Sequence, residues 1–150
     1  MPQSFVCLDC HVVFSTKNRQ PWIESPLADR LYAYLGGVFR AEGAKLVMVG
    51  GMPDHVHLLV SLGKNRGVAD LLRVTEANSS KWIHETFPHM AHFARQTGYG
   101  AFAVSHSNVE VVRAYIAGQL EHHRTRSFQE EFVALLKRHG IAFDERYLWD

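Results

Sequence analysis

The sequence has no apolar run long enough to cross a membrane, almost no net charge and only two cysteines. Its 150 residues are 47% hydrophobic and 21% charged, with a formal net charge of +1 at pH 7. A membrane-spanning helix needs about 20 consecutive apolar residues, and no stretch of this sequence approaches that. No basic segment precedes the apolar part of the N-terminus, as it would in a secretory signal. We therefore expect one cytoplasmic domain over residues 1–150, without a membrane partner.

The two cysteines form the segment CLDCH with His11, which has the spelling of a haem-attachment motif. Its neighbours read as a β-strand, so Cys7 and Cys10, three residues apart, would face opposite sides of a sheet. Haem attachment also requires export, and a zinc site would need two more ligands at a regular spacing. We interpret the pair as reduced thiols of a cytosolic protein, with at least one of them buried.

Hydrophobic periodicity predicts strands that alternate with helices. The expected strands are 4–15, 44–51, 55–62 and 99–105, and the expected helices are 26–42, 67–87, 109–123 and 128–140. Ser25 is a suitable N-cap with Pro26 in the first helical position, and Gly140 is a suitable end for the last helix.

The order β-α-β-β-α-β is the split βαβ, or ferredoxin-like, pattern. It predicts an α+β fold with an antiparallel sheet, helices on one face and extra C-terminal helices. On this plan residues 55–62 form an interior strand.

The segment MPDHVHLLVS, residues 52–61, places two histidines at alternate positions of that strand. His55 and His57 would point to one face while Val56 and Leu58 point to the other. Two imidazoles at this spacing are within reach of one metal ion, and Asp54 could orient one of them. The alternative is that both rings lie on an exposed face and do nothing. Spacing alone leaves both readings open.

The predicted helix 109–123 offers a second group of polar side chains. Its core stripe is expected to consist of Val109, Val112, Ile116 and Leu120. Tyr115 and Gln119, four residues apart, would stack on one side of this stripe. Taken alone, such residues are typical of a half-buried aromatic and a surface amide.

In combination, these residues resemble the single-tyrosine HUH transposases of small bacterial insertion sequences, which move as single-stranded DNA. The matching stretches are HVVFSTKNR (11–19), MPDHVHLLV (52–60), YIAGQLEHHRTRSFQEEFVALLKRHGI (115–141) and YLWD (147–150). The chain differs from the family at Phe14, which is often Trp, and at Asn18, which is often Tyr. The resemblance covers nearly the whole chain, so residues 1–150 are expected to form a single transposase catalytic domain.

The resemblance implies that His55, His57 and Gln119 hold a divalent metal and that Tyr115 is the nucleophile. Mg²⁺ is the expected ion; Mn²⁺ should also serve, because imidazoles are softer ligands than Mg²⁺ usually takes. The implied reaction cleaves and rejoins single-stranded DNA at hairpin-bearing element ends through a 5′-phosphotyrosine.

The implied partners are DNA hairpins and a second copy of the chain, since the family forms homodimers with active sites shared between subunits. Whether the tyrosine acts in cis or in trans is left open by the sequence. Candidate phosphate contacts are Lys17, Arg19, Arg73, Lys81, Arg124 and Arg126. His122 and His123 could lie near the site, but polar residues at a helix end are the simpler account.

Two other functions compete with this one. The first is a relative that binds DNA hairpins without cutting them. The second is a small metallophosphodiesterase that uses His55 and His57 with a water nucleophile, a reading that gives Tyr115 no task.

Overall fold

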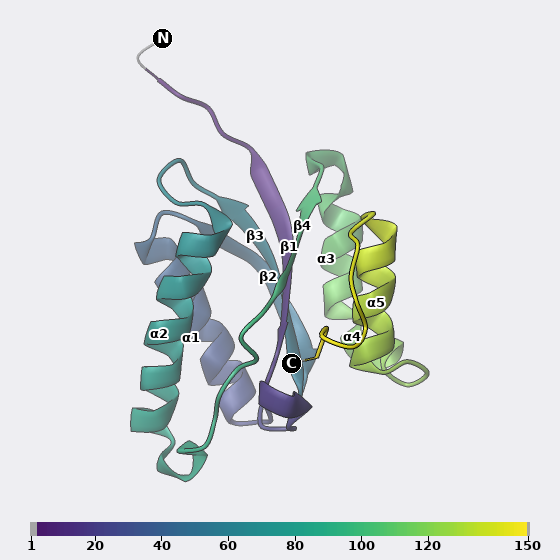
Figure 1. The fold of residues 1–150 in the computed structure, drawn as a ribbon. Helices are drawn as coiled ribbons and strands as arrows, with labels where there is room; N and C mark the ends of the chain where they lie inside the picture. The colour runs from purple at the N-terminus through teal and green to yellow at the C-terminus, as the bar shows by residue number, and fades with distance from the viewer. Residues whose placement is uncertain (1–2, 150) are drawn as a thin grey trace.

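A computed structural model describes residues 3–149 and shows a four-stranded antiparallel sheet between two layers of helices (Figure 1). The strands are β1 (Leu8–Ser15), β2 (Lys45–Met52), β3 (His55–Leu62) and β4 (Gly100–Val104). Their order in the sheet is β2-β3-β1-β4. β3 is therefore an interior strand, as the sequence predicts, and it pairs with β2 on one side and β1 on the other.

The helices fall into two groups on opposite faces of the sheet (Figure 1). The longer ones, α1 (Leu27–Ala41) and α2 (Val68–Thr86), cover one face. The other face carries α3 (Val109–Ala117), α4 (Gln119–His122) and α5 (Phe128–Arg138). Short 3₁₀ turns are η1 (Lys17–Arg19), η2 (Pro88–Met90) and η3 (His106–Asn108). This arrangement confirms the predicted α+β fold with a split βαβ sheet and extra C-terminal helices. Over residues 3–149, no helix has the length and apolarity to cross a membrane.

Alternation along β3 separates two chemical environments. Val56, Leu58 and Val60 point into the apolar core between the sheet and the helices α1 and α2. That core removes large side chains such as Phe39 and Ile83 from water, which is the main driving force for folding. His55 and His57 point to the opposite face, beneath α3, α4 and α5, and both are fully buried.

Two local predictions about the helices are wrong. Ser25 does not cap α1, because the helix begins at Leu27 and Pro26 takes the cap position without a side-chain hydrogen bond. The predicted helix 109–123 is interrupted at Gly118, between α3 and α4. Beyond this break Gln119 turns inward and is buried, whereas Leu120 is 65% exposed instead of joining the core. In this inward position the Gln119 amide bonds to His55 and Glu131. An apolar side chain such as Leu120 would leave these buried polar groups without that partner.

Other local predictions are confirmed. Gly140 follows the end of α5 with a φ of 66°, a left-handed conformation that favours glycine. Cys10 is buried and Cys7 exposed, and both are free thiols. Burial and the neighbouring Asp9 carboxylate raise the pKa of the Cys10 thiol to about 11, which keeps it protonated and unreactive.

Gly50 in β2 allows α3 to lie close to the sheet. A Cβ atom at this position would come within 2.6 Å of the Ile116 carbonyl oxygen and 3.2 Å of its Cγ2. Backbone at such a distance has to move, so Gly50→Ala is expected to lower the free energy of unfolding by about 1–3 kcal/mol. Urea denaturation measures the change.

The matched control for this change is Gly37→Ala, on the exposed side of α1. A Cβ atom there would meet nothing within 4 Å, and alanine is the better helix former by about 1 kcal/mol. The control should therefore be neutral or slightly stabilising. Equal stability of both variants would contradict the close approach of α3 to β2.

Candidate metal and nucleophile site

The Nδ1 atoms of the two histidines of β3 are both hydrogen-bonded, which fixes the orientation of their rings. Nδ1 of His55 lies 2.7 Å from Oδ1 of Asp54, the residue before it. Nδ1 of His57 lies 2.8 Å from Nε2 of His11 on the neighbouring strand β1. With one ring nitrogen of each histidine already bonded, the two Nε2 atoms are directed to the same side of the sheet.

Side chains from α3 and α4 lie against the two histidines. Oε1 of Gln119, from α4, lies 3.1 Å from Nε2 of His55 and 3.0 Å from Nε2 of His123. The Tyr115 ring, from α3, has its centroid 5.9 Å from that of His57. The structure thus brings together all four residues that the sequence assigned to the site, and it does so within one chain.

Glu131 of α5 occupies the centre of this cluster and is 1% exposed. Its Oε1 accepts a hydrogen bond from Nε2 of His57 at 2.9 Å and lies 3.1 Å from Nε2 of His123. Its Oε2 accepts hydrogen bonds from the Tyr115 hydroxyl and, at 3.2 Å, from Nε2 of Gln119. One carboxylate therefore touches both the histidines and the tyrosine.

Burial and the Glu131 charge set the protonation states. Burial opposes a charge on His55, but hydrogen bonds to Asp54, Glu131 and Gln119 outweigh it and raise its pKa to about 9. Burial lowers the pKa of His57 below its ordinary value, and the bond to Glu131 offsets this only in part. When no metal ion is bound, His55 is therefore protonated at neutral pH, and its positive charge faces the Glu131 carboxylate.

The carboxylate and the phenol shift in opposite directions. Burial acts to raise the pKa of Glu131, but hydrogen bonds from His55 and His57 hold it well below its usual range. Burial and the hydrogen bond to Glu131 raise the pKa of Tyr115 above its ordinary value. The Tyr115 hydroxyl is therefore a proton donor to Glu131 at neutral pH.

The donor set fits a divalent cation. One ligand atom from each of His55, His57, His123 and Glu131 lies within 4.8 Å of the others. Outer hydrogen bonds that fix the ring nitrogens of ligating histidines are a regular feature of metal sites, and His55 and His57 both have them. Nitrogen and oxygen donors in this mixture suit Mn²⁺ and related ions.

A cavity of about 280 Å³ opens beside Tyr115, between β4, α3 and α5. Its wall includes the imidazoles of His11 and His139, the Phe102 ring and the Arg138 guanidinium. The His139 and Phe102 rings are stacked, with centroids 4.5 Å apart. Aromatic faces together with a cation are features that bind nucleotides.

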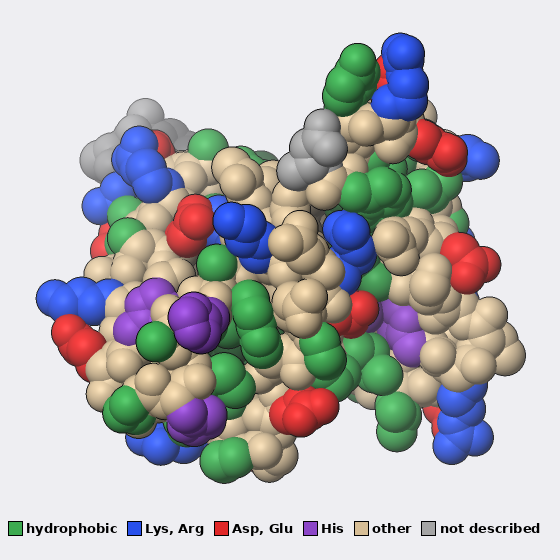
Figure 2. Space-filling view, turned by 60° about the horizontal axis from the view of Figure 1, so that its bottom comes forward, with side chains coloured by type: hydrophobic (Ala, Val, Ile, Leu, Met, Phe, Trp, Pro, Cys, Tyr) green, Lys and Arg blue, Asp and Glu red, His purple; other side chains and the backbone are tan. Residues whose placement is uncertain are grey.

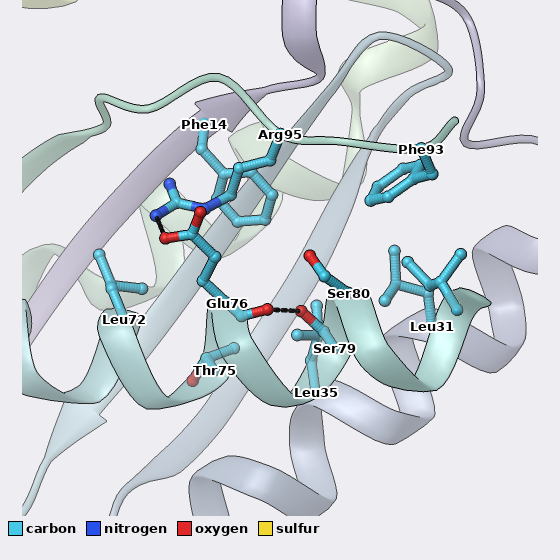
Figure 3. A pocket seen from close by; sticks show the side chains of 11 residues that line it. Phe14, Leu31, Leu35, Leu72, Thr75, Glu76, Ser79, Ser80, Phe93 and Arg95 are labelled. Atoms are coloured by element: carbon cyan, nitrogen blue, oxygen red, sulfur yellow. Dashed lines mark hydrogen bonds and ion pairs between the residues drawn. The ribbon is translucent and has the colours of Figure 1, made fainter. Parts of the chain in front are cut away.

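A second hollow, of about 20 Å³, lies on the other face of the sheet, between β1, α1 and α2 (Figure 3). There the Arg95 guanidinium lies over the Phe14 ring and forms an ion pair with Glu76. Phe14, one of the two departures from the family pattern, is therefore remote from the histidine cluster.

The six candidate phosphate contacts do not gather in one place. Arg73 and Lys81 lie on α2, across the sheet from the histidines, and Arg73 is paired with Asp70 at 2.9 Å. Arg124 and Arg126 directly follow α4, and Arg124 lies 3.3 Å from Glu121. Figure 2 shows Lys and Arg side chains spread over one face with acidic and polar groups between them.

The last two candidates, Lys17 and Arg19, are on η1. The Arg19 guanidinium lies 5.5 Å from the centre of the Trp149 ring, near the C-terminus. Of the six, Arg124 and Arg126 lie nearest in the sequence to the site residues of α4. The DNA-binding role of all six stays a prediction.

Sequence reasoning missed Glu131 and His11 and gave His123 a surface role. The signal for Glu131 was present: it falls between Phe128 and Leu135 on the buried stripe of its helix, where an acid requires a partner. His11 could not be found in this way, because its contact with His57 depends on how β1 pairs with β3. The side chain of His123 is 6% exposed and bonds to Gln119 and Glu131, so the simpler account of it is wrong.

Comparison with known proteins gives a consistent result. Residues 4–119 match the family described as IS200-like transposases. The ISDra2 transposase TnpA of Deinococcus radiodurans is 25% identical over 83 residues, which are 55% of this chain and 59% of that protein. The chain thus spans less than two thirds of the length of this curated relative.

Solved structures share the fold. A crystal structure of a candidate transposase from Deinococcus radiodurans R1 superposes with a TM-score of 0.64 and 26% identity, covering 77% of this chain and 93% of that one. A REP-associated tyrosine transposase bound to a REP hairpin superposes with a TM-score of 0.61, covering 81% and 72% of the two chains. At 13% identity, the second match shows only that the two chains share a fold.

Proposed function

Because the chain belongs to the family of IS200-like transposases, we propose that it cleaves and rejoins single-stranded DNA at hairpin-bearing ends through a covalent 5′-phosphotyrosine. One observation carries this proposal: the Tyr115 hydroxyl, Gln119 and the two histidines of β3 meet around the Glu131 carboxylate. Neither the spacing of the histidines nor the position of the tyrosine alone would support it.

Tyr115 is the proposed nucleophile. Its oxygen forms a bond to phosphorus, the bond from phosphorus to the 3′-oxygen breaks, and the downstream strand stays attached to the enzyme through its 5′-phosphate. The phenolic proton passes to Oε2 of Glu131, to which it is already hydrogen-bonded, and the departing 3′-oxygen takes a proton from water. Attack by another 3′-hydroxyl reverses these steps, so the phosphotyrosine conserves the linkage for rejoining without ATP.

His55, His57 and Gln119 are the proposed ligands of a divalent metal, with Mg²⁺ expected and Mn²⁺ also suitable. When bound, the cation would offset the negative charge that develops on the scissile phosphate. The chain itself contributes a rigid support, because Asp54 and His11 hold the outer nitrogens of the two imidazoles.

The proposed substrate is a DNA hairpin with a single-stranded flank. A protein of the same fold is bound to a REP hairpin, and the cavity beside Tyr115 is large enough for part of a nucleotide. Unpaired bases can stack on aromatic side chains, and Phe102 and His139 offer such surfaces. Arg138 and the arginines after α4 would then contact phosphates.

One chain completes this arrangement by itself, which supports action of Tyr115 in cis. The homodimer with shared active sites that the resemblance implies stays a prediction. Exchange of α3 between subunits would require the same contacts to form with the partner's strands.

The two competing functions lose support but predict different results. A hairpin-binding relative that does not cut has no need for a tyrosine bonded to a buried carboxylate. A metallophosphodiesterase with a water nucleophile would not place a phenol in the site. The presence of Tyr115 in the cluster therefore favours covalent cleavage with Tyr115 as the nucleophile.

The test uses end-labelled hairpins taken from imperfect palindromes that flank the gene, incubated with the protein and Mn²⁺. A phosphotyrosine carries the strand downstream of the cut, so a label at the 3′ end should stay with the protein on a denaturing gel. A 5′ label should be released on a shorter strand. A shifted native complex without any denaturant-resistant species would favour the binding module, and turnover without a covalent species would favour the phosphodiesterase.

A further inference from the structure

The C-terminal segment adds two ligand atoms that the three-ligand site does not use. Resting on the proposed function, we propose that Glu131 and His123 are also ligands of the divalent cation, so that cation binding fastens α5 and the end of α4 to the sheet. The site then has five protein donors, one of them charged.

The distances between these donors have the spacing of one coordination shell. Ligand atoms about 2.1 Å from one cation lie about 3.0 Å apart at neighbouring corners of an octahedron. Oε1 of Glu131 lies 2.9 Å from Nε2 of His57, 3.1 Å from Nε2 of His123 and 3.4 Å from Nε2 of His55. Oε1 of Gln119 lies 3.0 Å from Nε2 of His123 and 3.1 Å from Nε2 of His55.

The orientation of His123 points to a cation. Its Nδ1 lies 2.7 Å from the backbone carbonyl oxygen of Arg126, which can only accept, so this nitrogen carries a hydrogen. In the neutral ring, Nε2 therefore presents a lone pair toward Oε1 of Gln119 and Oε1 of Glu131. Three electron-rich atoms that face one another are stabilised by a positive charge between them.

His11 allows His57 to change partners without loss of its outer hydrogen bond. When Nε2 of His57 donates to Glu131, Nδ1 can accept a hydrogen bond from Nε2 of His11. When Nε2 of His57 is a ligand instead, Nδ1 carries the hydrogen and His11 accepts it. The pair of rings is therefore compatible with both states of the site.

Charge also favours Glu131 as a ligand. The partners that the structure gives this buried carboxylate are imidazoles, a phenol and an amide. When His55 binds a cation through Nε2, its ring is neutral and no longer offsets the Glu131 charge, so the cation takes over that role. Two imidazoles and an amide alone would give Mg²⁺ or Mn²⁺ no negative ligand. Because Oε2 keeps the Tyr115 hydroxyl, Glu131 would connect the cation to the nucleophile.

The experiment measures Mn²⁺ binding by the full chain without DNA, by calorimetry and by the electron paramagnetic resonance signal of free Mn²⁺. We expect Glu131→Gln and His123→Asn to raise the Kd by about 10- to 100-fold or more, since loss of an outer-shell partner alone has that effect. Adjacent changes serve as controls: Glu130→Gln retains the capping box at the start of α5, and His122→Asn alters a ring that lies against Tyr115. Both controls should leave the Kd unchanged.

Hydrogen exchange provides a second readout. Mn²⁺ should slow exchange of the α5 amides in the wild type and in the controls, but much less in Glu131→Gln. Circular dichroism in EDTA shows whether each variant folds, and Glu131→Asp, which keeps the charge on a shorter side chain, should give an intermediate Kd if Glu131→Gln does not fold.

Three results would overturn the inference: no Mn²⁺ binding by the wild type, the same Kd in all variants, or tighter binding by Glu131→Gln, which would mean that the carboxylate competes with the cation. The proposed function is tested separately. Covalent DNA adducts with an unchanged Kd in both variants would refute the ligand role and leave the transposase reaction intact. A raised Kd in both variants, together with no adducts from the wild type at saturating Mn²⁺, would support the ligand role and refute the transposase reaction.

Discussion

Replacement of Tyr115 by phenylalanine is expected to abolish the covalent protein–DNA species while hairpin binding continues. The change removes only the oxygen that would bond to phosphorus, and removal of a nucleophile lowers turnover by about four orders of magnitude or more. The ring keeps its packing, since it lies 4.5 Å from the His122 ring and 6.1 Å from the His11 ring between centroids. Adducts are measured on denaturing gels and hairpin binding on native gels.

Tyr147→Phe is the matched control, because that tyrosine is 65% exposed and outside the cluster. It should form adducts at the wild-type rate. Loss of the Tyr115 hydroxyl removes one hydrogen bond to Glu131, so the free energy of unfolding should fall by only about 1 kcal/mol. Adduct formation by Tyr115→Phe at the wild-type rate would remove Tyr115 from its proposed role.

Removal of divalent cations is expected to have the second-largest effect. Cleavage by chelator-treated protein should fall by about 10³-fold or more in EDTA, because charge stabilisation by a metal ion contributes several kcal/mol to the transition state. Mn²⁺ or Mg²⁺ should restore it in the wild type. His57→Ala should not recover at the concentration that saturates the wild type, since it loses a ligand and leaves Glu131 without its closest imidazole.

An exposed histidine of η2, His89, provides the control. His89→Ala should show the wild-type response to EDTA and Mn²⁺. Hairpin binding should survive EDTA in all three proteins if phosphate contacts depend on Lys and Arg. Undiminished cleavage in EDTA would exclude a metal-dependent reaction.

Much of the fold follows from local patterns. The bounds of β3 are those predicted from the sequence, because its alternation is continuous and a turn with Pro53 and Asp54 precedes it. The β-α-β-β-α-β order then predicts the sheet order, since few topologies satisfy it. The prediction failed where local signals compete with tertiary contacts. An uninterrupted helix through Gly118 would have buried Leu120, but the polar cluster holds Gln119 in that position.

The sequence by itself determined which residues could carry the chemistry. His55 and His57 must share a face of a strand, because the side-chain period of a strand is two residues. The resemblance to a known family added Tyr115 and Gln119 and assigned their roles. The shared face of the histidines follows from spacing and residue type, whereas the roles of Tyr115 and Gln119 rest on the resemblance.

Only the tertiary structure decided what meets the two histidines. The register of β1 against β3 places His11 beside His57, and the packing of α5 on the sheet inserts Glu131 between the imidazoles and the phenol. Glu131 follows His57 by 74 residues, so neither propensity nor periodicity links them. The reason is physical: a buried carboxylate is stable only among hydrogen-bond donors or cations, and these donors exist only once four separate segments have folded together.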